Sequence, residues 1–427
     1  MKKIVLSFSL LLISLLAIGC SKGTDSNVTG NSGVSGDRVK IVVTSWRTED
    51  IDRMDRINAE FTKKYPNIEI DFQPVKDTEY DAQLKQSLAA GVGADVIFLR
   101  SYDSGYQVYK TKSLMNLSEM LPTLKTFPSS ALAAWATPEG VSYGIPSAGV
   151  VHGVYYRKSI FKKYNLDIPK TWDDFISVAE TLQKNGETVF AQGTKDNWML
   201  YEVMYAGLGA NFYGGEVARQ KLLRKEARMT DPNFVIALEK MKELQKYFPK
   251  GFQAVDYVTM QQMFGTGAAA MFMGGSWEIG IFEDLGGLDD VGYFAPPVAK
   301  AGDKLQYCFH VDAGIAANVN TQYPNEVKIY MEWLASPEYA QLYMNELPGF
   351  FSYTPGSYTL NNELAKQMQS YISDSVPTVR TVWEGLSAQD PSGNALVGEA
   401  IQLMYADTLT IPEAAEYIDD GLSWFYK

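Results

Sequence analysis

Residues 39–72 of the chain, VKIVVTSWRTEDIDRMDRINAEFTKKYPNIEIDF, decide its fold. The stretch opens with a β-rich run, VKIVVT, and then places Met54, Ile57 and Phe61 at the three- and four-residue spacing of one helical face. Residues 68–72 alternate between apolar and acidic side chains, as in a half-buried strand. A strand, a helix and a second strand in this order predict a parallel α/β unit.

The same alternation continues beyond this stretch. Tyr80, Leu84 and Leu88 mark one face of a second helix, and the apolar run at residues 96–99 marks a third strand. Three strands separated by two helices are typical of a parallel α/β sheet, so we expect this part of the chain to form one α/β lobe.

Helix-start signals show that the pattern returns later in the chain. Residues 171–174 (TWDD) form a capping-box pattern, while Asp231-Pro232 and Ser336-Pro337 place a proline at the first position of a helix. The chain has 427 residues, which is more than one hydrophobic core usually holds together. These observations predict two α/β lobes.

The N-terminus predicts export from the cytoplasm. Residues 1–19 place two lysines ahead of an apolar run of secretory length, which is too short for a stable membrane span. Residues 17–20 are similar to a bacterial lipobox, in which Cys20 receives a diacylglycerol, although Ala17 departs from the usual leucine. A secreted protein with an unmodified cysteine is the alternative. Residues 20–36 would then be the lipidated cysteine and a flexible linker rich in Gly and Ser.

Composition excludes several classes of function. The chain carries 50 Asp and Glu against 38 Lys and Arg, a net charge of −12, whereas nucleic-acid binding needs a basic face. Its only histidines are His152 and His310, and its only cysteines are Cys20 and Cys308, so we expect no metal site and no cofactor. Aromatic residues make up 13%, which suits a core and equally a sugar-binding cleft.

Several segments resemble, in their order and spacing, those of the extracellular solute-binding proteins of ABC importers, specifically the sugar-binding group. The resemblance spans nearly the whole chain after the export signal. The matching segments are residues 93–98 (GADVIF), 143–146 (YGIP), 154–161 (VYYRKSIF), 170–175 (KTWDDF), 267–277 (GAAAMFMGGSW) and 332–338 (EWLASPE).

The resemblance implies a periplasmic-binding-protein-like fold, in which two α/β lobes are joined by three hinge crossings and a ligand binds in the cleft between them. The crossings are expected near residues 147–149, 307–310 and 347–349. Lobe one would then comprise residues 37–148 and 310–347, and lobe two residues 149–309 and 348–427.

A pyranose presents apolar C–H faces and a ring of hydroxyls, so its site needs aromatic platforms and charged or amide hydrogen-bonding groups. Trp277 follows Gly274-Gly275-Ser276 at the end of an apolar run, which suggests an indole projected into the cleft. A buried core tryptophan is the alternative. Trp383 lies where the family often places a second aromatic side chain, with the same alternative.

Five further residues complete the candidate site. Asp196 with Trp198 matches a loop that carries a carboxylate and an aromatic ring in maltose-binding relatives. Trp46 and Arg47 close the first strand, and Asp103 follows the third strand, where it could accept hydrogen bonds from hydroxyls or be a solvated loop residue.

Arg47 and Arg100 leave the charge of the ligand open. Guanidinium forks recognise carboxylates bidentately, so an acidic saccharide is an alternative to a neutral one, and a surface salt bridge explains either arginine equally well. His152 could touch ligand or be a hydrogen-bonded core residue, and Cys308 is expected to be a small buried hydrophobe. The other tryptophans are expected to be structural: Trp135, Trp172, Trp333 and Trp424.

The resemblance implies a binding protein and not an enzyme. It would capture a sugar or oligosaccharide and deliver it to the permease subunits of an ABC transporter. A surface carbohydrate-active enzyme and a sugar-sensing subunit of a signalling system are the alternatives. We expect a monomer, lipid-anchored to the outer face of the cytoplasmic membrane, or periplasmic in a host with two membranes.

Overall fold

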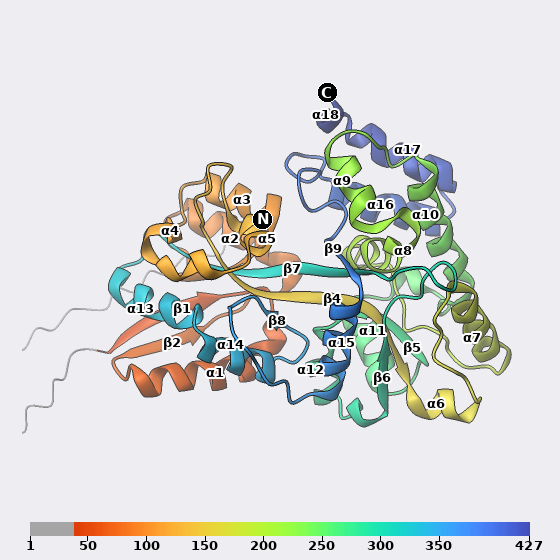
Figure 1. Ribbon diagram of the computed structural model, residues 1–427, viewed down its shortest axis with the longest axis horizontal. Coiled ribbons are helices and arrows are strands. Elements are labelled where there is room, and N and C mark those ends of the chain that lie inside the picture. Colours follow the sequence, from red (N-terminus) through yellow and green to blue (C-terminus); the bar gives the residue numbers. More distant parts are fainter. Residues whose placement is uncertain (1–37) are drawn as a thin grey trace, which may run out of the picture. The chain divides into compact units, whose positions relative to one another are not determined.

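The computed structural model of the chain describes residues 38–427 (Figure 1). The predicted export signal at residues 1–19 and the predicted lipidation site and linker at residues 20–36 lie outside the described residues. Among the helices of residues 38–427, none is both long enough and apolar enough to cross a membrane.

The strands of residues 38–427 form one curled, mixed sheet in which β2, β1, β3, β7, β4 and β5 follow one another. As predicted, β1 pairs in parallel with both β2 and β3. The pairing of β3 with β7 is antiparallel, which the local pattern did not predict. The strands are β1 Val39–Thr44, β2 Ile68–Phe72, β3 Val96–Arg100, β4 Ile145–Arg157, β5 Met271–Gly275, β6 Val291–Phe294, β7 Gln306–Ala317, β8 Phe351–Ser352 and β9 Val376–Thr378.

Two long strands, β4 and β7, connect the two ends of this sheet (Figure 1). Residues 145–151 of β4 pair with β7, and from residue 152 onward β4 pairs with β5 and then also with β6. In the same way, β7 pairs with β3 through residues 313–317 and with β9 through residues 306–308. Each of the two strands therefore belongs to both ends of the sheet.

One group of helices accompanies β1, β2 and β3. The face of α1 that carries Met54, Ile57 and Phe61 is buried, as the spacing of these residues predicts. Tyr80, Leu84 and Leu88 are buried along α2 in the same way. The helices of this group are α1 Ile51–Lys64, α2 Asp77–Ala89, α3 Tyr102–Lys110, α4 Leu117–Met120, α5 Ser129–Leu132, α13 Pro324–Leu334 and α14 Pro337–Glu346.

A second group of helices surrounds the other end of β4 and β7. Its unusual member is η4, Leu200–Leu208, which is a π-helix. The remaining helices are α6 Lys158–Lys163, α7 Trp172–Lys184, α8 Ala210–Tyr213, α9 Gly215–Leu223, α10 Pro232–Leu244, α11 Tyr257–Gly265, α12 Glu278–Asp284, α15 Glu363–Asp374, α16 Gly393–Tyr405, α17 Ile411–Gly421 and α18 Ser423–Tyr426.

The predicted helix starts are confirmed. The Thr171 hydroxyl accepts the backbone N–H of Asp174 at 3.3 Å, and the Asp174 carboxylate accepts that of Thr171 at 3.1 Å, which completes a capping box. Pro232 and Pro337 occupy the first positions of α10 and α14. At these positions the local sequence alone determines where a helix begins.

Two of the three predicted crossings fall inside the long strands. Residues 147–149 lie in β4, and residues 307–310 lie in β7. Residues 347–349 follow the end of α14 and precede β8, which pairs with Ala148 and Gly149 of β4. The exact boundaries of the two lobes stay a prediction.

Gly349 and Ser276 hold the third crossing against β4. The Ser276 hydroxyl accepts the backbone N–H of Val151 at 3.1 Å and donates to the backbone carbonyl of Gly349. Gly349 has a φ of +98°, and a Cβ added there would lie 1.9 Å from the Ser276 carbonyl oxygen. The close approach of two backbones, in addition to the dihedral angle, therefore requires glycine at this position.

We expect Gly349→Ala to destabilise the fold by clearly more than the roughly 1–2 kcal/mol that the left-handed conformation alone costs an alanine. Gly302→Ala is a matched control, because Gly302 has a φ of +91° and nothing within 4 Å of an added Cβ. Urea unfolding of both variants gives the two free energies. Equal losses in the two variants would show that the contact with Ser276 does not constrain the crossing.

Candidate functional site

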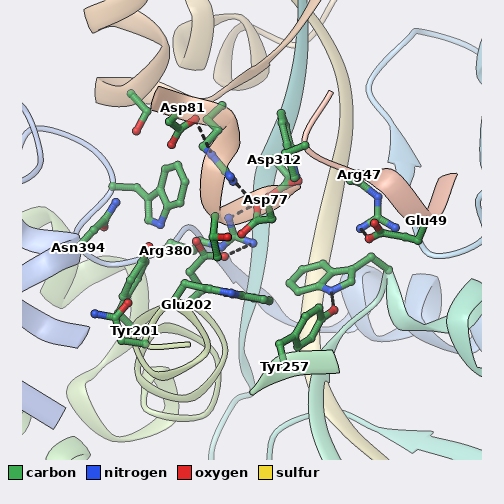
Figure 2. Close-up of a pocket in the computed structure, with 18 of the residues that line it drawn as sticks. Arg47, Glu49, Asp77, Asp81, Tyr201, Glu202, Tyr257, Asp312, Arg380 and Asn394 are labelled. Carbon is green, nitrogen blue, oxygen red and sulfur yellow. Dashed lines mark hydrogen bonds and ion pairs between the residues drawn. The ribbon is translucent and has the colours of Figure 1, made fainter. Parts of the chain in front are cut away.

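A cavity of about 340 Å³ lies among the segment that follows β1, α2, β3, η4, β7 and the segment that follows β9. Its volume is at the lower end of the range usual for small-molecule sites. Figure 2 shows Arg47 at one end of the cavity, Asn394 at the other, and Arg380 between them. The lining therefore comes from segments far apart in the sequence.

Five of the seven residues predicted for the site line this cavity: Trp46, Arg47, Trp198, Trp277 and Trp383. The structure brings them together from residues that precede α1, from the start of η4, from the end of β5 and from the segment after β9. Arg100, which was left open, lines the cavity as well, whereas His152 does not.

Asp103 and Asp196 are not in the cavity wall, which corrects their predicted placement. The Asp103 carboxylate accepts the backbone N–H of Ser387 at 2.9 Å. The Asp196 carboxylate accepts the backbone N–H of Tyr257, the first residue of α11, at 2.8 Å. Both acids serve backbone donors because the segments that meet them come from distant parts of the chain, and local sequence did not reveal those neighbours.

From the sequence, Trp277 could be an indole projected into the cleft or a buried core residue. In the structure it is buried and also lines the cavity, so the two descriptions do not exclude each other. Only 7% of its surface is exposed, and its indole N–H donates to the Tyr257 hydroxyl at 2.8 Å. Trp383 is 3% exposed, and its indole N–H has no hydrogen-bond partner within residues 38–427. A buried N–H without a partner is uncommon, and here it belongs to a residue of the cavity wall.

Arg380 occupies the centre of the cavity floor. Its guanidinium pairs with Glu202 of η4 at 3.0 Å and with Asp312 of β7 at 2.9 Å. The same group lies 5.2 Å from the ring centre of Trp383 and 5.7 Å from that of Trp277. One cation is thus held by two carboxylates and two indoles.

The same arrangement occurs at Arg100. Its guanidinium pairs with Asp77 at 2.7 Å and with Asp81 at 3.2 Å, both on α2. It lies 4.7 Å from the ring centre of Trp46, so one face of that indole is covered by a cation.

Arg47 repeats the arrangement a third time. Its guanidinium pairs with Glu49 at 3.1 Å, bonds both carboxylate oxygens of Asp50, and lies 4.8 Å from the ring centre of Phe350. Each arginine of the cavity wall is therefore neutralised by two carboxylates and packed on an aromatic ring. The bidentate pair with Asp50 satisfies the Arg47 guanidinium at a largely buried position of the wall, and not on the surface as the salt-bridge interpretation expected.

Sequence reasoning missed several residues of the wall. Glu202 and Tyr201 come from the π-helix η4, for which the sequence carries no signal that we can identify. Arg380 lies three residues before Trp383, and Asp312 lies two residues after the predicted second crossing, so proximity to these features could have found both. Burial raises the pKa of Glu202 to about 7, although the guanidinium of Arg380 favours the ionised form.

Cys308 and His152 both lie in the core. Cys308 is fully buried. His152 is fully buried as well, and burial lowers its pKa further below the usual range, so the ring is neutral. The four tryptophans expected to be structural do not line the cavity: Trp135, Trp172, Trp333 and Trp424.

Comparisons with known proteins agree with one another. Residues 48–341 match the family described as bacterial extracellular solute-binding protein. The chain is 28% identical to an uncharacterised ABC transporter extracellular-binding protein of Pyrococcus horikoshii, over 68% of this chain and 69% of that one. It is 24% identical to a multiple sugar-binding protein of Streptococcus mutans serotype c, over 80% of each chain. A chitin oligosaccharide binding protein of known structure has a TM-score of 0.78 at 21% identity, over 92% of this chain and 100% of that one. The predicted fold class is confirmed.

Glu278 supports the cavity wall from behind. It is fully buried, accepts the Tyr257 hydroxyl at 2.7 Å and the Gln261 side-chain amide at 2.8 Å, and thereby orients the tyrosine that receives the Trp277 N–H. Burial raises the pKa of Glu278 to about 7 from its usual value near 4.5. The folded state therefore holds this proton more tightly than the unfolded state does.

Stability should accordingly fall as the pH rises between about 4.5 and 7, by on the order of 3 kcal/mol from this group. Glu278→Gln carries no titrating group, so we expect the wild type to lose stability relative to this variant between pH 5 and pH 8. Urea unfolding of both proteins at the two pH values measures the difference. Parallel pH profiles would contradict the raised pKa.

Proposed function

The chain belongs to the bacterial extracellular solute-binding protein family, and from this premise we propose that it captures a saccharide outside the cytoplasm and delivers it to the permease of an ABC importer. The observation that carries the proposal is a cavity whose wall combines four indole rings with five carboxylates. Indoles cover the apolar faces of a pyranose, and carboxylates accept its hydroxyls.

The aromatic part of the wall is held in a fixed geometry. The Trp198 and Tyr257 rings meet edge to face with their centres 4.7 Å apart, and the ring centres of Trp198 and Trp277 are 6.3 Å apart. The Tyr257 hydroxyl is in turn fixed by its bonds to Trp277 and Glu278. Rigid rings lose little conformational freedom when a ligand binds, so this wall is suited to recognition.

The charges favour a neutral saccharide over an acidic one. The wall holds the three guanidiniums of Arg47, Arg100 and Arg380, and each is already paired with two carboxylates. A uronate would have to displace a protein carboxylate that lies at ion-pair distance. The remaining lone pairs of the carboxylates can accept hydroxyl protons without displacing anything.

The proposal includes binding without bond cleavage. The relatives named above are described as binding proteins. The acids of the wall are occupied by guanidiniums, an arrangement that orients their oxygens as acceptors. Appearance of shortened products from any oligosaccharide would contradict this part of the proposal.

We also propose that Cys20 carries the lipid that holds the protein on the outer face of the cytoplasmic membrane. The support is the lipobox-like sequence before Cys20. A tethered receptor meets its permease at a raised effective concentration, which favours transfer of the cargo. Release of the full-length protein from membranes by lipoprotein lipase, without detergent, would support the anchor; release by salt would contradict it.

A thermal-shift panel on residues 38–427 tests the saccharide assignment. Glucose, galactose, xylose and their oligosaccharides, glucuronate and galacturonate, amino acids and phosphate esters are the probes. We expect a neutral saccharide to raise the midpoint, since ligand at about 100 times its Kd adds roughly 2.7 kcal/mol of stability. A shift by an amino acid or phosphate ester and by no saccharide would refute the assignment.

Substitutions of Trp198 test whether the saccharide that shifts the midpoint binds in this cavity. It lines the cavity and is half-buried. Trp198→Ala should weaken binding of the active saccharide by about tenfold, whereas Trp198→Phe keeps a ring and should retain most of it. Equal binding by Trp198→Ala and wild type would place the saccharide elsewhere.

A bidentate ion pair joins the predicted lobes on the side of the cavity that Arg47 occupies. The Arg53 guanidinium of α1 bonds both oxygens of the Asp284 carboxylate of α12 at 2.8 Å and the Gly280 carbonyl at 3.2 Å. By the predicted boundaries, α1 belongs to lobe one and α12 to lobe two. The pair therefore stabilises the closed arrangement, in which both lobes can contact one ligand.

We expect Asp284→Asn to weaken saccharide affinity by up to about fivefold, because the loss of a half-exposed pair lowers the population of the closed form by up to about 1 kcal/mol. Glu332→Gln is the control, since the Lys328–Glu332 pair lies within α13 alone. Isothermal titration calorimetry measures both affinities. An unchanged Kd for Asp284→Asn would show that the pair does not influence closure.

A further inference from the structure

Glu278 is a fully buried acid that takes no part in the ion pairs of the cavity wall. It is the first residue of α12, and its carboxylate oxygens accept hydrogen bonds from the Tyr257 hydroxyl and the Gln261 side-chain amide. Both donors are neutral side chains of α11, and within residues 38–427 no arginine, lysine or histidine pairs with this carboxylate. Glu202, in contrast, pairs with Arg380. A charge buried without a counter-charge is costly, so the site of Glu278 favours the protonated carboxyl.

The surroundings of Glu278 do not supply the missing cation. The charged and titratable groups around Glu278 and its helix are Tyr257 of α11, His152 and Tyr155 of β4, Arg47 and Glu49 ahead of α1, and Arg53 of α1 with its partners Glu283 and Asp284. Both arginines are already paired, Arg47 with Glu49 and Asp50 and Arg53 with Asp284, and His152 is neutral. Burial therefore raises the pKa of Glu278 to about 7, although the bonds from Gln261 and Tyr257 oppose the rise.

A directed chain of hydrogen bonds connects Glu278 to the cavity wall. An indole N–H can only donate, so the Trp277 N–H occupies the Tyr257 oxygen at 2.8 Å, and the Tyr257 hydroxyl hydrogen is directed to Glu278. Tyr257 is half-buried and lies in the wall toward the end of the cavity that Arg47 occupies (Figure 2). While Glu278 is ionised, the Tyr257 hydroxyl therefore has no hydrogen to offer to a ligand.

Protonation of Glu278 reverses one bond of this chain. The Gln261 amide already donates to Oε2, so the carboxyl proton finds its partner from Oε1, where it donates to the Tyr257 oxygen. That oxygen then accepts from both Glu278 and Trp277, and the hydroxyl hydrogen of Tyr257 is released from Glu278. A released hydrogen on a residue of the cavity wall can donate to an oxygen of a bound molecule, and leaving it unpaired costs free energy.

We propose that Glu278 is a positioning residue that acts on the ligand through Tyr257: when Glu278 carries a proton, the Tyr257 hydroxyl donates to an oxygen of the bound saccharide, so that binding is coupled to the uptake of a proton. This inference rests on the proposed function and adds to it a dependence on pH. The guanidiniums of the wall already donate to carboxylates, so the released Tyr257 hydrogen is a donor that the oxygens of a saccharide can use.

Calorimetric titrations of residues 38–427 at pH 6 and pH 8 test the coupling. Glucose, galactose, xylose and their trisaccharides are the probes. Affinity that depends on the protonated carboxyl is complete below its pKa in the free protein and falls as the pH rises through that value, so we expect binding to weaken by up to about tenfold between pH 6 and pH 8. Titrations in two buffers of different ionisation enthalpy should show the uptake of about half a proton at pH 7.5.

Glu278→Gln assigns the proton to this residue. The variant has no titrating group at this position, so we expect it to lose most of the pH dependence of affinity and most of the proton uptake. Glu187→Gln is the matched control, because Glu187 accepts the Tyr164 hydroxyl at 2.6 Å and neither residue lines the cavity. It should keep the wild-type pH dependence. Glu202 also titrates near pH 7, but it is present in all three proteins and its effect cancels in the comparison.

The outcomes separate this inference from the function on which it rests. A wild type that binds saccharide without proton uptake, an affinity that rises with pH, or a Glu278→Gln variant that keeps the wild-type pH profile would overturn the coupling while the saccharide assignment stands. Tyr257→Phe removes the relayed hydrogen, should lose the same pH dependence, and replaces Glu278→Gln if that variant does not fold. If no saccharide binds the wild type at either pH, both the proposed function and the coupling are wrong.

Discussion

The ion pairs of Arg380 with Glu202 and Asp312 are the interaction on which the cavity depends. A guanidinium buried to this extent is tolerated only where carboxylates and hydrogen bonds replace its water. Those carboxylates come from η4 and from the long strand β7, so satisfying one cation fixes the relative position of three distant segments. Trp277 and Trp383 then pack on the same guanidinium, and two indoles of the wall are set by it.

Arg47 and Arg100 extend the same principle to the rest of the wall. The same arrangement, a guanidinium packed on an aromatic ring and paired with two carboxylates, occurs three times around one cavity. The wall is therefore highly polar, but each of its cations is already neutralised by protein carboxylates. Such a wall resists collapse, because removing any one partner leaves a buried charge uncompensated. The lone pairs that stay free in this wall belong to carboxylate oxygens, which is why we propose a ligand rich in hydroxyls.

The sequence predicted those features that local pattern determines. Helix starts at Thr171 and Pro232 follow from capping chemistry, and Trp46 and Trp277 were found because each follows directly after a strand. Asp103 was misplaced because its partner, the Ser387 N–H, lies far along the chain. Glu202 could not be found, since a π-helix changes which residues share a face and the usual 3.6-residue period does not apply.

Continuity of β4 and β7 connects the two ends of the sheet. Because each strand pairs at both ends of the sheet, small rotations there move whole walls of the cavity together. The hydrogen bond of Asp103 with the Ser387 N–H joins elements of the two predicted lobes, so under the proposed function a ligand that touches both lobes would favour the same arrangement. Asp103, which was expected to accept a ligand hydroxyl, accepts this backbone N–H instead and so joins α3 to the segment that follows β9.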